Sequence, residues 1–195
     1  MTLCVAPLTG PAMHAALDDL ARLRIAVFRD WPYLYDGTPD YEQGYLRLFA
    51  KGKDAVIVTA RDNGEVVGCA TGSALATHHG PLQAPFVKAG YDLDEIFYCG
   101  ESVLLPQYRG QGIGHLFFEE REKYARARGY KFATFCGVVR PAHHPARPKD
   151  YQPLDEFWKK HGYCKMDGLM AHFSWTDIGD DRPSDKPMQF WLKAL

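Results

Sequence analysis

The stretch from Glu101 to Gly114 constrains the fold more than any other part of the chain. It reads ESVLLPQYRGQGIG: an apolar run, a turn with three glycines in five residues, and then the start of a helical pattern. Glycines let the backbone approach a ligand closely, and a helix that begins there directs free N–H groups and the positive end of its dipole toward that ligand. The stretch therefore predicts a site for a phosphate-bearing ligand.

Spacing argues against two common phosphate-binding motifs. The NTPase loop ends in Gly-Lys-Ser/Thr, whereas Gly114 is followed by His115 and Leu116, which leaves no lysine for terminal phosphates and no hydroxyl for magnesium. The dinucleotide fingerprint G-x-G-x-x-G would need a glycine at position 115, and it belongs near the start of a βαβ unit. Neither motif fits this turn.

A third motif does fit the turn. The residues RGQGIG at Arg109–Gly114 resemble the R/Q-x-x-G-x-G/A signature of the GNAT superfamily of N-acetyltransferases, and the family's usual Pro-x-Tyr-Arg precedes them at Pro106–Arg109. A second match, FWKKHGY at Phe157–Tyr163, resembles the family's Phe-Tyr-Glu-Lys-x-Gly-Phe near the end of its last helix. The alternative is a plain strand-to-helix turn, which the strand before and the helix after make the weaker interpretation.

Composition indicates one globular domain over residues 1–195. Hydrophobic residues make up 46% and charged residues 24%, and the net charge of −1 carries no block of like charges, so neither nucleic acid nor an anionic membrane is expected as a partner. Five widely spaced cysteines indicate reduced thiols, and no run approaches about 18 apolar residues. We expect a cytoplasmic protein without a metal site, whose default partner is a small molecule or a peptide end.

Periodicity and turn signals predict the element order β-α-α-β-β-β-α-β-α-β-β, which is similar to the GNAT fold over essentially the whole chain. That resemblance implies an α/β (α+β) fold with a mixed, mostly antiparallel central sheet flanked by helices. Asp40 is expected to cap the second helix, and Asn63-Gly64 to turn a β-hairpin. The expected strands are 2–8, 55–60, 65–76, 95–105, 132–139, 163–175 and 188–195, and the expected helices are 11–28, 40–50, 113–128 and 153–161.

The resemblance also assigns a cofactor site. In the GNAT family the glycine-rich loop binds the pyrophosphate of acetyl-CoA, which is a co-substrate. The residues implied here are Arg109, Gly110, Gln111, Gly112, Ile113 and Gly114. The backbone around Val103 and Leu104 would pair with the pantetheine arm, and a main-chain N–H there could donate to the oxyanion of the reaction.

Two positions depart from the family pattern. The tyrosine that many members use to protonate the departing thiolate falls at Trp158, whose indole N–H is not a usable acid near neutral pH. The asparagine that often opens the last helix falls at Tyr151. We expect Tyr151 to be the acid, ahead of Cys136 and Tyr98, and a covalent acetyl-Cys136 is a remote alternative.

Glu101 is the predicted general base. An ionised carboxylate inside the apolar run Ile96–Leu105 is costly without a partner, which is typical of functional carboxylates. Two alternatives give Glu101 no catalytic role, because it either faces outward or pairs with an arginine. Glu95 acting through a chain of waters is another candidate base.

The segment 29–45, RDWPYLYDGTPDYEQGY, is unusually rich in aromatic residues for a polar loop. Aromatic faces and carboxylates together attract a cationic group, so Trp31, Tyr33, Tyr35 and Asp36 are predicted to bind an amine acceptor. The alternative is that these rings only pack between two helices and hold them together.

These features predict an N-acetyltransferase that moves an acetyl group from acetyl-CoA to a primary amine of a small molecule, by direct transfer in a ternary complex. Trp158 keeps open a non-catalytic acyl-CoA sensor, and the acidic residues at 36, 40 and 42 keep open an enzyme for protein N-termini or lysines. A homodimer, the acyl chain length and the identity of the acceptor stay undetermined at this level.

Overall fold

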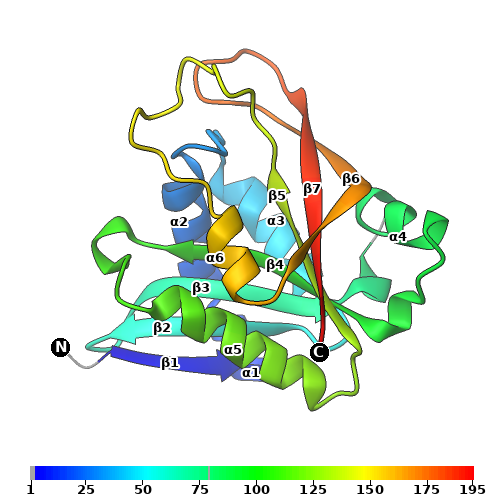
Figure 1. The fold of residues 1–195 in the computed structure, drawn as a ribbon. Coiled ribbons are helices and arrows are strands. Elements are labelled where there is room, and N and C mark those ends of the chain that lie inside the picture. Colours follow the sequence, from blue (N-terminus) through cyan, green and yellow to red (C-terminus); the bar gives the residue numbers. More distant parts are fainter. Residues whose placement is uncertain (1–2, 79) are drawn as a thin grey trace.

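The computed structural model describes residues 3–78 and 80–195. Within them, seven strands form one sheet in the order β1-β2-β3-β4-β5-β7-β6 (Figure 1). The neighbouring strands are antiparallel except for β4 and β5, which are parallel. This confirms the expected mixed, mostly antiparallel sheet. The strands are β1 Leu3–Leu8, β2 Val56–Asp62, β3 Glu65–Ala74, β4 Ile96–Leu104, β5 Phe132–Val138, β6 Cys164–Trp175 and β7 Ser184–Ala194.

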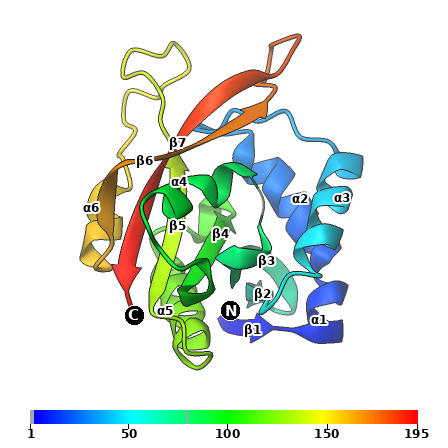
Figure 2. The ribbon, with the colours of Figure 1, turned by 90° about the vertical axis from the view of Figure 1, so that its right-hand side faces the viewer.

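Helices cover both faces of the sheet (Figures 1 and 2). One face carries three helices near the N-terminus, and the other carries α5 and α6. The bounds are α1 Gly10–Ala15, α2 Leu17–Phe28, α3 Pro39–Phe49, α4 Ala84–Lys88, α5 Ile113–Arg126 and α6 Asp155–Lys160. No helix among the described residues is long and apolar enough to cross a membrane.

The sequence-based boundaries differ most from the structure at three places. The single expected helix 11–28 is two helices, because the N–H of Ala16 donates to Met13 O at 3.0 Å and ends α1 at Ala15, before α2 begins at Leu17. Thr38, not Asp40, caps α3, since Pro39 already occupies the first turn and the Tyr41 N–H donates to the Thr38 hydroxyl at 3.4 Å. Strand β7 begins at Ser184, because its pairing with β6 continues to Trp175.

The β2–β3 hairpin forms as predicted. Asn63 and Gly64 have φ of 49° and 90°, the left-handed values that a tight two-residue turn requires. The segment between β3 and β4 contains α4. The order of the longer elements is therefore the predicted one.

The hydrophobic core has a layer on each face of the sheet. The layer under α2 and α3 includes Leu20, Leu23, Leu46, Ile57 and Val103, all almost completely buried. The layer under α5 and α6 includes Phe97, Phe118, Phe135, Tyr163 and Trp191. Because both faces are covered, a polar group on a central strand such as β4 needs a partner within the protein.

Strands β4 and β5 start together and then separate. Their pairing spans Ile96–Tyr98 on β4 and Phe132–Thr134 on β5, and beyond it the two strands diverge (Figure 1). On its other edge β4 carries a bulge, because the partner of Ala70 is Ser102 whereas the partner of Gly72 is Cys99. The bulge places Glu101 where β4 leaves β5.

Candidate active site

The glycine-rich turn has the backbone of an anion-binding site. Gly110 and Gly112 have φ of 76° and 83°, and Gly112 is the residue immediately before α5. Among the described residues, no acceptor takes a hydrogen bond from the N–H groups of Gly110–Gly114. The left-handed glycines turn the chain so that these free donors gather at the positive end of the α5 dipole, which suits a phosphate group.

Arg109 borders this turn on its β4 side. Its Nε donates to Leu104 O at 3.2 Å, and its guanidinium lies 3.8 Å from the half-exposed carboxylate of Asp30. Such an exposed ion pair is weak and exchanges readily for a stronger anion. The predicted cofactor residues from Arg109 to Gly114 therefore lie together at one helix end.

Helix α6 packs directly on the start of α5. A Cβ added at Gly114 would lie 3.3 Å from the Phe157 ring, so the glycine makes room for α6. The next residue, Trp158, packs so closely on β5 that a Cβ at Gly137 would lie 2.9 Å from its indole. The same ring contacts Phe135 at a centroid distance of 5.0 Å. Trp158 thus fills core space where the family pattern has a tyrosine.

After the bulge, the N–H groups of successive β4 residues point alternately toward β3 and away from it. The N–H of Leu105 donates to Val67 O at 3.0 Å, and the alternation of antiparallel pairing then joins Val103 to β3. Ser102 and Leu104 direct their N–H groups to the opposite edge, from which β5 has diverged. The prediction named Val103 and Leu104 and missed Ser102, although alternation from Leu104 would have indicated it.

Glu101 lies on the face of β4 that α2 and α3 cover. Its side chain is 5% exposed, and its Oε2 accepts an ion pair from Arg24 Nη1 at 2.8 Å. The Nε of Arg24 also donates to Glu42 Oε2 at 2.5 Å. Of the alternatives left open for Glu101, pairing with an arginine is therefore present. Its other oxygen, Oε1, is buried and accepts no hydrogen bond from the described residues.

The sequence analysis missed Arg24, and it named Glu42 only as one of the acidic residues at 36, 40 and 42. Arg24 falls four residues after Leu20 and four before Phe28, so it interrupts the apolar face of α2. Glu42 likewise falls four residues before Leu46 on α3. A charged residue on an apolar helix face was the signal available. Burial lowers the pKa of Arg24, but Glu101, Tyr45 and Glu42 outweigh burial, and the net pKa is raised.

Two tyrosines and one thiol lie near the Glu101 carboxylate, because its charge contributes to the raised pKa values of Tyr33, Tyr45 and Cys69. Burial raises the pKa of Tyr33, Tyr45 and Tyr98 well above the ordinary tyrosine value, and the pKa values of Tyr33 and Tyr45 also respond to the nearby charges of Glu101 and Arg24. The Tyr98 hydroxyl lies 3.4 Å from Cys136 Sγ, and burial raises the pKa of that thiol to about 12. A thiol this hard to ionise is a poor nucleophile at neutral pH, which disfavours a covalent acetyl-cysteine.

The four predicted acceptor residues lie in the loop between α2 and α3, in different surroundings. Trp31 packs edge-to-face on Tyr151 with a centroid distance of 5.8 Å. Tyr33 is partly buried and packs on Phe28 with a centroid distance of 4.5 Å, and Tyr151 contributes to its raised pKa. The exposed Asp36 pairs with Arg29 at 3.1 Å. Trp31 and Tyr33 thus face the region of Tyr151, whereas Asp36 points to solvent.

Tyr35 lies beside the Glu42 carboxylate of α3. Its pKa is raised by burial first and then by the charge and hydrogen bond of Glu42. The predicted acid, Tyr151, is half-buried on the segment that precedes α6, and burial raises its pKa as well. Tyr151 therefore lies near Trp31 and Tyr33 of the loop, and Tyr33 in turn lies near Glu101.

The side chain of Arg140 holds the α2–α3 loop in place through hydrogen bonds to its backbone. Arg140, on the segment after β5, donates to Pro32 O at 2.8 Å and Tyr33 O at 2.5 Å, and it forms a two-pronged ion pair with Asp177 at 2.6 and 3.0 Å. Asp177 also pairs with Lys186 at 3.3 Å. Burial tends to raise the pKa of Asp177, but the hydrogen bonds and charges of these two cations lower it overall.

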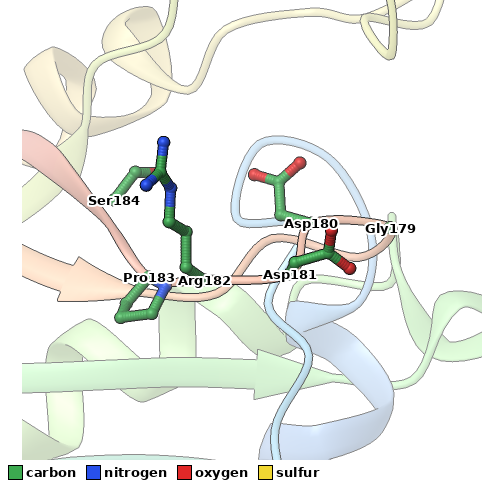
Figure 3. Close-up of a pocket in the computed structure, with 6 residues that line it drawn as sticks. All are labelled: Gly179, Asp180, Asp181, Arg182, Pro183 and Ser184. Carbon is green, nitrogen blue, oxygen red and sulfur yellow. The ribbon is translucent and has the colours of Figure 1, made fainter.

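The β6–β7 turn lies alongside the same loop. The N–H of Ile178 donates to Leu34 O at 2.7 Å, and the N–H of Asp36 donates to Thr176 O at 3.0 Å. Figure 3 shows a surface depression in this turn, lined by Gly179–Ser184. The depression is lined only by consecutive residues of this turn, and it lies apart from the glycine-rich turn at Arg109–Gly114. The described residues contain no group of three or more histidine, cysteine, aspartate or glutamate side chains placed to hold a metal ion.

Comparison with known proteins gives a match to a family sequence model and many matches to solved structures. The sequence model of the acetyltransferase (GNAT) family matches residues 20–163. No curated protein matches the chain significantly.

Solved structures with the same fold cover the whole chain at low identity. An N-acetyltransferase from Staphylococcus aureus Mu50 has a TM-score of 0.61 at 13% identity, with 100% of this chain and 99% of that chain covered. A GCN5-related N-acetyltransferase from Kribbella flavida has a TM-score of 0.60 at 14% identity, with 99% and 98% covered. A ribosomal-protein-alanine N-acetyltransferase from Brucella melitensis has a TM-score of 0.62 at 14% identity, with 98% and 99% covered. At such identity these structures show a shared fold.

Proposed function

The chain belongs to the acetyltransferase (GNAT) family, and on that premise we propose that it transfers an acetyl group from acetyl-CoA directly to a primary amine of a small molecule. The observation that carries the proposal is the set of free N–H groups at Gly110–Gly114, next to a β4 strand that has separated from β5. Enzymes of this family act on an acceptor substrate, and the type of acceptor is the finer part of the proposal.

The residues present fit the donor. The amides of Gln111, Gly112, Ile113 and Gly114 and the Arg109 side chain would hold the pyrophosphate, because free donors at a helix N-terminus favour that charge. The backbone of Ser102 and Leu104, which faces away from β3, would pair with the pantetheine arm. When bound, acetyl-CoA supplies the acetyl group as a thioester.

The side chains around β4 would move the protons of the reaction. The amine nitrogen bonds to the carbonyl carbon of the acetyl group as the carbon–sulfur bond breaks. Glu101 accepts the proton that the amine loses through its free Oε1, and the Ser102 N–H donates to the carbonyl oxygen, where negative charge develops. Tyr151 donates the proton that the leaving sulfur takes up.

The acceptor side favours a compact cationic amine. Glu101, Tyr33 and Trp31 come from β4 and from the loop that Arg140 fastens, and they offer a carboxylate and aromatic rings at one place. Such groups attract an ammonium. A protein N-terminus is the other acceptor to test, since one protein of the same fold is a ribosomal-protein-alanine N-acetyltransferase.

Calorimetry with coenzyme A tests the donor site. We expect the wild type to bind and the double variant Arg109→Ala, Gly112→Asp to lose at least about 100-fold in affinity, because an aspartate would place negative charge against the phosphates. The matched control is Arg128→Ala at the other end of α5, where an exposed arginine pairs with Asp54. Equal binding by the double variant and the wild type would remove the basis for the proposal.

A thiol-release assay tests the acceptor, with a panel of polyamines, aminoglycosides, amino acids and peptides. Release that a small amine accelerates, with the amide product found by mass spectrometry, supports the proposal. Faster reaction with peptides would reassign the acceptor to protein N-termini or lysines. Slow hydrolysis that no amine accelerates would instead indicate an acyl-CoA sensor.

A further inference from the structure

Three charged side chains meet inside the protein beside β4. Arg24 of α2 lies between Glu101 of β4 and Glu42 of α3, with contacts of 2.8 Å and 2.5 Å. The side chains of Arg24, Glu42 and Glu101 are 12%, 0% and 5% exposed. Two carboxylates therefore share one guanidinium, and the three ionised side chains together have a net charge of −1.

The surroundings of this group add little charge of their own. Tyr45 of α3, Tyr33 of the α2–α3 loop and Cys69 of β3 interact with the charge of Glu101, and all three have raised pKa values, so they are neutral near pH 7. Arg121 of α5 approaches from the opposite face of the sheet, where it donates to Glu101 O at 3.3 Å. The charge that contacts the Glu101 carboxylate is therefore that of Arg24, which Glu42 contacts in turn.

Proton transfer changes the balance of these charges. Before the reaction the group holds two carboxylates and one guanidinium. When Glu101 takes a proton from the amine, it becomes a neutral carboxylic acid, and Arg24 keeps Glu42 as its counter-ion. Without Glu42, the same proton would leave a buried guanidinium unpaired, which is strongly unfavourable.

We propose that Arg24 and Glu42 are positioning residues that set the proton affinity of Glu101 in opposite directions. Arg24 orients Glu101 and holds its charged form, and Glu42 competes for the guanidinium and makes proton uptake easier. The inference rests on the proposed function for the role of Glu101 as the base. Its charge coupling is a property of the protein alone, so it is measurable without a substrate.

The test is a titration of Glu101 by NMR, using protein labelled with ¹³C at the glutamate side-chain carboxyl carbon. The Glu101 signal is identified by its loss in Glu101→Gln. Relative to the wild type, the titration midpoint is expected to rise by at least one pH unit in Arg24→Met and to fall by at least one unit in Glu42→Gln. A loosened fold would move both variants in the same direction, so opposite signs separate electrostatic coupling from structural damage.

A matched control and a second arginine variant complete the design. Glu122→Gln removes another buried carboxylate, which Lys193 and Arg126 hold on α5, and it should leave the Glu101 midpoint unchanged. Arg24→Lys keeps the charge but offers one nitrogen, so its midpoint should move less than that of Arg24→Met. The inference is overturned if the Glu42→Gln and Arg24→Met midpoints stay at the wild-type value or move in the same direction.

The acetyl-transfer rate separates this inference from the proposed function. If an amine is acetylated, the acid limb of kcat/KM should move in the same directions as the NMR midpoints, while coenzyme A affinity stays constant. Opposite NMR shifts in a protein that acetylates no amine would uphold the coupling and reject the proposed acceptor chemistry. Opposite NMR shifts in an active enzyme whose acid limb does not move would reject Glu101 as the base and leave both the coupling and the transferase activity standing.

Discussion

The two halves of the proposed active site are built in different ways. The donor half is a short continuous piece of backbone, Arg109–Gly114, whose exposed N–H groups gather because of left-handed glycines and the start of α5. The acceptor half consists of buried side chains from α2, α3, β4 and the segment after β5. Sequence motifs report the first kind of site directly, whereas the second kind exists only after folding.

The difference also separates the expected effects of substitution. A change at Arg109–Gly112 of the donor turn should alter coenzyme A binding with little loss of stability, since these four residues are exposed. Ile113 of the same stretch is fully buried and belongs to the core. A change on the acceptor side should leave coenzyme A binding intact and alter the rate, the acceptor KM or the stability. Four substitutions on the acceptor side test this contrast.

The largest effect is expected from Glu101→Gln. Removing a general base typically lowers kcat by about 10²–10⁴-fold, and the amide keeps the shape of the carboxylate. Coenzyme A affinity, measured by calorimetry, should stay within about twofold of the wild type because the pyrophosphate turn is untouched. A variant with wild-type kcat would remove Glu101 from the mechanism and leave the donor site as it stands.

Arg140→Gln should both loosen the acceptor loop and destabilise the protein. Breaking a buried ion pair costs about 3–5 kcal/mol, and we expect the lower end because Lys186 still pairs with Asp177. The displaced loop should raise the acceptor KM about tenfold with little change in coenzyme A affinity. Urea unfolding and initial rates measure the two effects.

The control for Arg140 is Arg128→Gln. Arg128 forms an exposed ion pair with Asp54 at 3.3 Å, which should contribute at most about 1 kcal/mol. If both variants lose the same stability and keep the same KM, Arg140 does not fasten the acceptor loop.

Gly100→Ala probes the β4 bulge that positions Glu101. A Cβ at this position would lie 2.5 Å from Thr71 Oγ1, the oxygen that accepts from the Glu101 N–H at 3.2 Å. The backbone must shift, at a cost of about 1–3 kcal/mol, and kcat should fall with Glu101 displaced. Gly44→Ala is the control, because its Cβ meets nothing within 4 Å and α3 should gain about 0.5–1 kcal/mol. Equal stability of the two variants would show that the bulge is not tightly held.

The smallest expected effect is the contribution of Asp177 to the pH dependence of stability. Its folded-state pKa is lowered below the ordinary value, so it contributes stability above the unfolded-state pKa of about 4. That contribution is lost as pH falls through the lower folded-state pKa. In Asp177→Asn the free energy of unfolding should therefore fall less steeply as the pH drops below about 4. Parallel curves for the variant and the wild type would contradict the ion pair.

Much of the fold was predictable because its signals are local. The hairpin followed from Asn63-Gly64, and the strand–turn–helix at Glu101–Gly114 followed from its glycines. The break at Ala16 was not predictable, since the apolar spacing of the N-terminal helix runs straight through it. The extension of β7 to Ser184 depends on pairing with β6, which no local pattern encodes.

The sequence by itself determined where phosphate-binding amides would lie, because positive φ at glycine and a helix N-terminus are properties of a few adjacent residues. It also showed that Trp158 could not be the usual acid. Only the tertiary structure decided that Arg24 joins Glu101 to Glu42, because α2, α3 and β4 come together only when the sheet is covered on both faces. Charges that are distant along the chain become partners when burial removes the water that would otherwise solvate them.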